Sequence, residues 1–293
     1  MALPSSSSAD ATARYYDRNT RLFLKSQKSA DADTIHRALY APGVEDRHQA
    51  LLYSNKLILR ELLRLKPQSV LDLGCGLGAT LAYLRSEYPD CRYRGITVSP
   101  VQRDLARAAE LPVDLWDYHE SAWFADHGKF DLVYAIESLQ HASDLGKVLD
   151  NLAASCVQGG RCIVVDDFLR DSPVPRDIPV PPKHLKTVDR FKRRWHAHGY
   201  RSRGEFIRMW SDRGFNLEAE QDLSAYQRSR PWLNRILSSI YAPLDRMPAI
   251  PAYAENLLGG NALLRLQDLG LSGYYFLVFA NSGLAEKGTV KSA

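Results

Sequence analysis

The chain has 293 residues, of which 45% are hydrophobic and 25% are charged, and its formal net charge is +4. These values are ordinary for a soluble globular protein, and the small net charge argues against nucleic acid as a partner, although basic residues cluster between 183 and 213. The sequence contains no run of about 20 apolar residues that would span a membrane. Because residues 1–13 also lack the apolar core of a signal peptide, we expect a cytoplasmic protein.

The first half of the chain alternates between two hydrophobic patterns. Residues 14–66 are predicted to be helical, since Arg47 to Leu65 carries leucines at helical spacing before Pro67. We then predict strands at 69–73, 92–97, 113–116, 130–136 and 161–166, and helices at 79–87, 100–110 and 145–156. Such alternation predicts an α/β fold with a Rossmann-like, doubly wound sheet that is mostly parallel.

The pattern changes after Asp167, where five prolines mark an irregular connection. Basic helices are expected in 183–213, a strand at 216–222, an aromatic and partly helical stretch at 223–265, and an antiparallel last strand at 273–280. We therefore divide the chain into a disordered tail 1–13, an N-terminal helical cap 14–66, a cofactor-binding core 67–172, a basic helical lid 173–213, remaining core strands 214–283 with an insertion at 223–265, and a tail 284–293.

The most informative motif is the stretch Val70–Gly78, a buried strand that runs into a turn with glycines at 74, 76 and 78. Glycine permits a positive φ and leaves no Cβ between the backbone and a ligand. In a parallel α/β sheet this turn lies at the carboxyl end of the first strand, where cofactors bind. Dinucleotide-binding turns look the same, so the glycines alone do not identify the cofactor.

Four segments in order carry a family resemblance: Val70–Gly78, Gly95–Gln102, Phe130–His141 and Gly159-Gly160-Arg161. With them the chain resembles the class I S-adenosylmethionine-dependent methyltransferases over about Arg14–Asp167 and the closing strand. The sequence Gly-Ile-Thr-Val-Ser-Pro-Val-Gln at 95–102 matches the sterol, tocopherol and cyclopropane branches of that family. The resemblance implies S-adenosylmethionine as the cofactor.

Asp72 fits this cofactor better than a pyrophosphate. A carboxylate at the strand end would repel phosphate but can partner the ammonium group of S-adenosylmethionine, directly or through water. Gly74, Gly76 and Gly78 would let the backbone pass under the methionine portion. The resemblance places the other cofactor contacts at Tyr16, Thr97, Ser99, Gln102, Asp117, Tyr118 and Glu137.

Five of these positions have specific roles in the related branches. The resemblance puts Thr97 and Gln102 near the ribose, where many family members instead have an acidic residue at the end of the second strand. Asp117 and Tyr118 would read the adenine amino group, and Tyr16 would close over the cofactor.

The candidate catalytic residues lie at the ends of the fourth and fifth strands. The methyl group is already activated, so the protein mainly aligns it with the nucleophile. A hydroxyl nucleophile also needs a base, whereas an alkene leaves a carbocation that must be stabilised and deprotonated. The resemblance to sugar O-methyltransferases pairs His141 with Asp166 or Asp167. The resemblance to sterol-type enzymes places Glu137 near the developing cation.

The acceptor is inferred from the segments outside the core, which combine aromatic rings with basic side chains. Such a pocket suits an apolar chain with a phosphate head. We predict acceptor contacts from Arg21, His36, Arg37, Gln140 and His184. The block Tyr16–Arg21 is similar to bacterial terpenoid-pathway methyltransferases, which implies C-methylation of a prenyl diphosphate and gives Mg²⁺ a place on the diphosphate.

Two alternatives stay open at this point. One is an O-methyltransferase for a sugar or polyketide hydroxyl of secondary metabolism, which would use His141 with Asp166 or Asp167. The other is a non-catalytic binding module with a methyltransferase fold, against which the intact Asp72 and glycine motif argue. For either enzyme we expect a small-molecule acceptor and no nucleic acid, and a homo-oligomer is compatible with the sequence.

Overall fold

The computed structural model describes residues 17, 20, 36–171, 181–241, 244, 247 and 252–283. The two tails predicted at 1–13 and 284–293 lie outside these residues, as do Tyr16 and Arg21. Within the described ranges no helix is long and apolar enough to cross a bilayer. The domain boundaries given above stay predictions.

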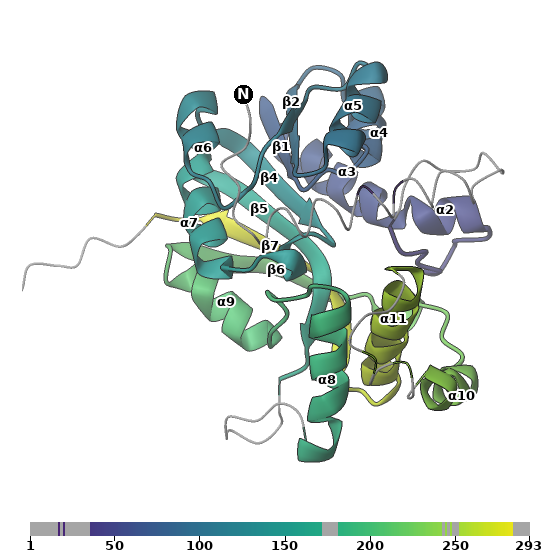
Figure 1. The fold of residues 1–293 in the computed structure, drawn as a ribbon. Coiled ribbons are helices and arrows are strands. Elements are labelled where there is room, and N and C mark those ends of the chain that lie inside the picture. Colours follow the sequence, from purple (N-terminus) through teal and green to yellow (C-terminus); the bar gives the residue numbers. More distant parts are fainter. Residues whose placement is uncertain are drawn as a thin grey trace, which may run out of the picture.

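A seven-stranded sheet forms the centre of the molecule (Figure 1). Its strands are β1 (Ser69–Leu73), β2 (Arg92–Thr97), β3 (Val113–Leu115), β4 (Phe130–Ile136), β5 (Cys156–Leu169), β6 (Phe215–Asp222) and β7 (Ser272–Asn281). Their order is β3-β2-β1-β4-β5-β7-β6, in which the first five strands are parallel and β7 is antiparallel to both of its neighbours. The predicted Rossmann-like, mostly parallel sheet with an antiparallel last strand is confirmed.

Helices cover both faces of the sheet and form an extension at one end (Figure 1). They are α2 (Arg47–Leu51), α3 (Tyr53–Leu65), α4 (Ala79–Glu87), α5 (Pro100–Ala108), α6 (Ala122–His127), α7 (Leu145–Ser155), α8 (Pro182–Arg194), α9 (Arg203–Ser211), α10 (Pro231–Tyr241) and α11 (Ala252–Asp268), with 3₁₀ turns η1 (Leu139–His141) and η2 (Ser224–Tyr226). The single helix predicted over 47–65 is divided at Leu52, whose ψ of −2° ends α2. Helix α6 was not predicted, because six residues are too few to show a helical period.

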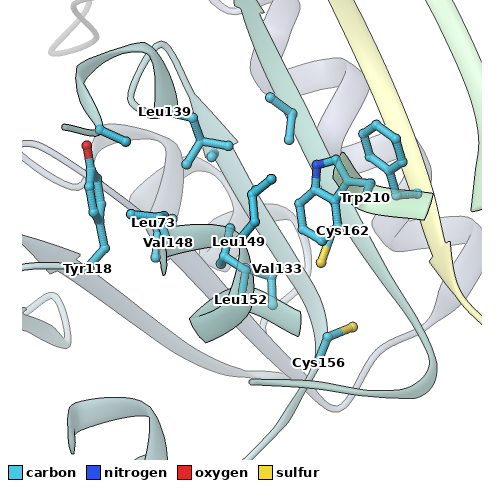
Figure 2. Packing of buried hydrophobic residues seen from close by; sticks show 14 of the residues in the cluster. Leu73, Tyr118, Val133, Leu139, Val148, Leu149, Leu152, Cys156, Cys162 and Trp210 are labelled. Atoms are coloured by element: carbon cyan, nitrogen blue, oxygen red, sulfur yellow. The ribbon is translucent and has the colours of Figure 1, made fainter. Parts of the chain in front are cut away.

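The hydrophobic core has one layer on each face of the sheet. On one face, α6, α7 and α9 pack against the sheet, and Figure 2 shows Leu73, Val133 and Cys162 meeting Leu149 of α7 and Trp210 of α9. On the other face, α3, α4 and α5 pack against a second layer that includes Ile163 and Val165. Side chains alternate between faces along a strand.

This alternation decides where the two acidic residues near the end of β5 point. Cys162, Val164 and Phe168 belong to the α7 layer, whereas Ile163 and Val165 belong to the α3 layer. By the same period, Asp166 points to the α7 face and Asp167 to the α3 face. The side chains of these two adjacent residues therefore lie on opposite faces of the sheet.

Helices α8, α10 and α11 form the extension, which we call the helical lobe (Figure 1). Helix α11 packs against both α8 and α10. The interior of the lobe includes Phe191, Trp195, Tyr200 and Leu263. Helix α9, which follows α8 in the basic segment, packs instead on the main sheet through Phe206 and Trp210.

Candidate functional site

The glycine turn between β1 and α4 is shaped by packing at two positions and is open at the third. Gly74, Gly76 and Gly78 all have a positive φ. A Cβ on Gly74 would lie 2.6 Å from the Cβ of Ser138, and one on Gly78 would lie 2.7 Å from Leu111 Cδ1. A Cβ on Gly76 would meet nothing nearer than a side-chain amide at 3.9 Å. Gly76 therefore borders the space in which a ligand can approach the backbone.

This difference predicts unequal effects of alanine at two of these glycines. Gly74→Ala is expected to lower the free energy of unfolding by about 3 kcal/mol, because the new Cβ adds a clash to the cost of a left-handed residue. Gly76→Ala is expected to cost only about 1 kcal/mol, from the backbone alone, while weakening S-adenosylhomocysteine binding. Urea denaturation and calorimetry measure the two quantities. Equal losses of stability would contradict the assignment of Gly74 to packing.

Asp72 is a buried residue of β1 whose carboxyl group has a raised pKa. It accepts a hydrogen bond of 2.8 Å from the hydroxyl of Tyr134 on β4. Burial raises the pKa of Asp72 to about 7, although the hydrogen bond from Tyr134 acts in the opposite direction. A carboxylate kept out of water in this way gains from a cationic partner. The site therefore suits the ammonium group predicted for it.

The polar side chains at the end of β2 form a connected network. Thr97 Oγ1 donates to Gln102 Oε1 at 3.0 Å, and the hydroxyl of Ser99 accepts a hydrogen bond from the Gln102 backbone at 3.1 Å as the N-cap of α5. Gln102 Nε2 donates to Thr20 at 3.0 Å, and Ser99 donates to Asp17. The structure thus brings the three predicted residues together.

Sequence reasoning missed Asp17 and Thr20, which contact this network from the N-terminal segment. The signal was present, because both belong to the block Tyr16–Arg21, in which we had assigned a cofactor contact only to the tyrosine. Asp17 also places a carboxylate beside the strand end where Thr97 replaces the acidic residue of many relatives.

Asp117 follows β3 and has one oxygen free for a ligand. Its Oδ1 accepts from the backbone of His119 at 3.0 Å and pairs with Nδ1 of the same residue at 2.6 Å. Its Oδ2 is buried and has no hydrogen-bond partner among the described residues. Burial alone would raise the pKa of Asp117, but the hydrogen bonds from His119 prevail and lower it. An ionised carboxylate with an unused oxygen fits the adenine amino group.

Tyr118 has a different role from Asp117. Its hydroxyl donates to the backbone carbonyl of Ser138 at 3.2 Å, so it joins the loop after β3 to the end of β4. Its ring lies in the core beside Leu139 and Val148 (Figure 2). We therefore propose that Tyr118 forms part of the wall of the site and that Asp117 is the residue that contacts the adenine amino group.

Residues from four distant segments meet at the ends of β4 and β5, and we call this group the acid cluster: Arg37, Glu137, Asp167, Gln267 and Tyr274. Glu137 Oε1 accepts from Tyr274 Oη at 2.7 Å and from the Arg37 backbone at 3.2 Å. The Arg37 guanidinium pairs with both oxygens of Asp167 and lies over the Tyr274 ring. Gln267 of α11 also donates to Asp167, at 2.9 Å.

The acid cluster holds two carboxyl groups against one guanidinium. Burial and Glu137 raise the pKa of Asp167 to about 6, although Arg37 opposes this shift. Asp167 is therefore mostly ionised at neutral pH. Although burial alone would lower the pKa of Arg37, the two carboxylates raise it above its usual value. Glu137 also has a φ of +51°, a strained conformation of the kind that clusters at functional sites.

The acid cluster changes the interpretation of Arg37 and His36, which we had predicted to bind an anionic head. Arg37 is committed to Asp167 and stacked on Tyr274. His36 Nε2 lies 2.9 Å from the hydroxyl of Thr80, and burial lowers its pKa, so the ring is neutral. These pairings argue against a phosphate ligand at either side chain.

A second group lies on the other face of the sheet, around η1. Asp166 accepts from the backbones of Gln140 at 3.1 Å and Asp167 at 2.9 Å. Burial and the neighbouring Asp167 raise the pKa of Asp166 well above the usual range, although the two backbone hydrogen bonds act in the opposite direction. Burial lowers the pKa of His141 to about 4, which leaves a neutral imidazole. The four predicted catalytic residues therefore divide into Glu137 with Asp167 and His141 with Asp166.

The lobe is joined to this second group by the backbone. The N–H of Gly199 donates to the carbonyl of Gln140 at 2.8 Å. The side-chain oxygen of Gln140 is buried without a hydrogen-bond partner among the described residues, as expected of a group that awaits a ligand. His184 lies half-buried in the first turn of α8, and in the described part of the chain no hydrogen bond or ion pair joins it to either group.

Neither group has the geometry of a metal site. Across the described residues there is no cluster of three or more His, Cys, Asp or Glu side chains that could hold a metal ion. We predicted Mg²⁺ on the diphosphate of the acceptor and not on a cluster of protein side chains. The finding for the described residues therefore does not test that prediction.

Comparison with known proteins gives three kinds of similarity. Residues 45–220 match the family model described as a methyltransferase domain. The chain is 33% identical over 152 residues to a probable tocopherol O-methyltransferase, chloroplastic, of Oryza sativa subsp. japonica, which is 49% of this chain and 41% of the relative. It is 26% identical over 181 residues to ajmaline N-methyltransferase of Rauvolfia serpentina, covering 55% and 59%. The chain thus spans about half the length of the curated relatives it matches.

The fold is shared with solved structures at much lower identity. The geranyl diphosphate C-methyltransferase of Streptomyces coelicolor A3(2) superposes with a TM-score of 0.64 and 16% identity, covering 96% of this chain and 100% of the other. These values establish a common architecture that extends through the helical lobe.

Proposed function

The chain belongs to the class I S-adenosylmethionine-dependent methyltransferases, and on that premise we propose that it methylates a carbon atom of an isoprenoid chain. When bound, the cofactor supplies a methyl group already activated by its sulfonium. Asp72, the backbone at Gly76, the network around Gln102 and the unused oxygen of Asp117 are the groups that would hold it.

The observation that carries the proposal is the charge of the acid cluster. Methylation of an alkene leaves a positive charge on the acceptor, and the carboxylates of Glu137 and Asp167 would stabilise that charge and take up the proton that is then lost. Among the described residues only Arg37 pairs with these carboxylates, so the acid cluster as defined is negative overall. The same charge would oppose the ionisation of an acceptor hydroxyl, so it favours carbon over oxygen.

The acid cluster also limits where an acceptor head can lie. A diphosphate within a few ångströms of Glu137 and Asp167 would meet like charge, and the one cation of the acid cluster, Arg37, is already paired with Asp167. We therefore propose that the apolar chain, and not the head, lies against the cluster. The proposal does not use Arg37 as a ligand for the head group.

O-methylation is the second candidate, and His141 favours it. A neutral imidazole at physiological pH can accept a proton from a hydroxyl. Its pKa of about 4 makes it a weak base, however, because efficient general bases titrate near the working pH. For this reason we rank O-methylation of a sugar or polyketide hydroxyl below C-methylation.

The proposal is tested with isotopically labelled S-adenosylmethionine and three acceptors: geranyl diphosphate with and without Mg²⁺, a neutral prenylated phenol, and a glycoside. We expect label on a chain carbon of one of the two prenylated compounds, identified by mass spectrometry. Label only on a hydroxyl oxygen would overturn the proposal in favour of the His141 alternative. The Mg²⁺ arm decides whether the metal is required.

A further inference from the structure

Helix α10 contacts the protein through a mixed polar and apolar face and exposes several apolar side chains on its outer face. Asn234 is 5% exposed, and its amide donates to Asp268 of α11 at 3.0 Å. Asn261 of α11 donates to the backbone carbonyl of Asn234 at 3.0 Å and accepts from Ser238 at 2.6 Å. Hydrogen bonds thus hold the inner side of α10, on which Leu233 and Leu237 are also half-buried.

The outward side of α10 carries an apolar stripe, which we define as Trp232, Ile236 and Ile240. These side chains are 63%, 49% and 60% exposed. Their spacing of four residues puts them on one face of the helix. A single exposed apolar residue is ordinary, but a contiguous apolar stripe on the outer face of a helix departs from normal helix amphipathicity. We therefore expect the apolar stripe to contact a partner outside the chain.

Positive charge flanks the stripe. Arg228, Arg230 and Arg235 are all exposed, and residues 228–241 contain no acidic side chain. The helix lies at the outer edge of the lobe, and α11 separates it from α8 (Figure 1). Helix α8 itself adds Lys183 and Lys186 to the exposed positive charge of the lobe.

We propose that α10 docks the protein on an anionic lipid bilayer. An exposed Trp with two Ile residues, bordered by arginines, is the composition of a helix that lies in the membrane interface. A second copy of the chain fits less well, because a two-fold contact would bring the arginines of both copies together. Three side chains also bury far less than the roughly 1,200 Å² of a stable dimer interface. The proposal is independent of the acceptor, since it concerns the protein surface alone.

The test is co-sedimentation of the full chain with vesicles, without cofactor or acceptor. One set of vesicles is phosphatidylcholine with about one-third phosphatidylglycerol, and the other is phosphatidylcholine alone. Trp232→Gln/Ile240→Gln removes most of the stripe, and Arg230→Gln/Arg235→Gln removes flanking charge. The matched control is Leu63→Gln/Leu105→Gln, which changes side chains that are 51% and 40% exposed on α3 and α5. Circular dichroism confirms that each variant is folded.

We expect the wild-type chain and the control to sediment with the anionic vesicles. The stripe variant is expected to lose at least about tenfold in partition coefficient, and the charge variant is expected to bind less and to lose its salt dependence. Absence of wild-type binding would overturn the proposal, as would an equal loss in the control variant. Sedimentation velocity that shows a dimer abolished by the stripe variant, without vesicle binding, would assign the surface to a second copy instead.

Discussion

Replacing Glu137 with glutamine is expected to lower kcat by about a hundredfold to a thousandfold, or roughly 3–4 kcal/mol in the activation barrier. Glutamine keeps the side-chain oxygen that accepts from Tyr274 and from the Arg37 backbone, so the geometry of the acid cluster is preserved. Only the negative charge is lost. If that charge stabilises a cation on the acceptor, the loss appears in kcat and not in cofactor affinity. Steady-state kinetics measures kcat, and calorimetry with S-adenosylhomocysteine measures the affinity of the cofactor site.

Two companion variants separate charge from position. Tyr274→Phe removes a hydrogen bond to Glu137 but leaves its charge, so we expect a loss of no more than about tenfold. His141→Gln removes the imidazole on the other face of the sheet and is expected to leave C-methylation within a few-fold of wild type. Should Glu137→Gln retain full activity while His141→Gln loses it, the chemistry would belong to the His141 group and the acceptor atom to oxygen.

The sequence was informative about the fold because central strands such as β1 and β4 are buried on both faces. Mostly apolar runs such as 69–73 and 130–136, each of which contains one aspartate, end at polar or glycine residues, and the structure has β1 and β4 over the same residues. The order of the glycine motif, the Thr97 strand end and the Glu137 loop then identified the family. These features depend on neighbours in the chain, which a sequence displays directly.

The composition of the acid cluster could not be predicted in the same way. Arg37 and Asp167 are 130 positions apart, and Glu137 and Tyr274 are 137 apart, so only the folded topology brings them together. A basic residue near an aromatic segment suggested a phosphate ligand, whereas the structure gives Arg37 a carboxylate partner. The opposite orientation of Asp166 and Asp167 does follow from strand alternation, but which face carries the cluster depends on Arg37 and Gln267.

Asp72 is expected to make cofactor affinity depend on pH. Its carboxyl group has a pKa of about 7 when the site is empty of a cation, and we propose that the ammonium of S-adenosylmethionine binds the ionised form. Below pH 7 a proton must be lost before the contact forms, so the dissociation constant should rise about twentyfold as pH falls from about 7.5 to about 5.5. Asp72→Asn should bind about 10–100-fold more weakly at pH 7.5 and lose most of this dependence. Tyr134→Phe removes a hydrogen bond that lowers the pKa, so its midpoint should move upward.

The same shift predicts the pH dependence of stability in the absence of cofactor. The folded chain keeps a proton on Asp72 between its ordinary pKa of 3.8 and about 7, whereas the unfolded chain releases it. The free energy of unfolding should therefore fall as pH rises through this window and level off above pH 7. Asp72→Asn carries no such charge, so at pH 8 it should be more stable than wild type, by on the order of 4 kcal/mol. Urea denaturation at several pH values measures the difference. A variant that is less stable at pH 8 would mean that the wild-type carboxylate already has a cationic partner within the protein.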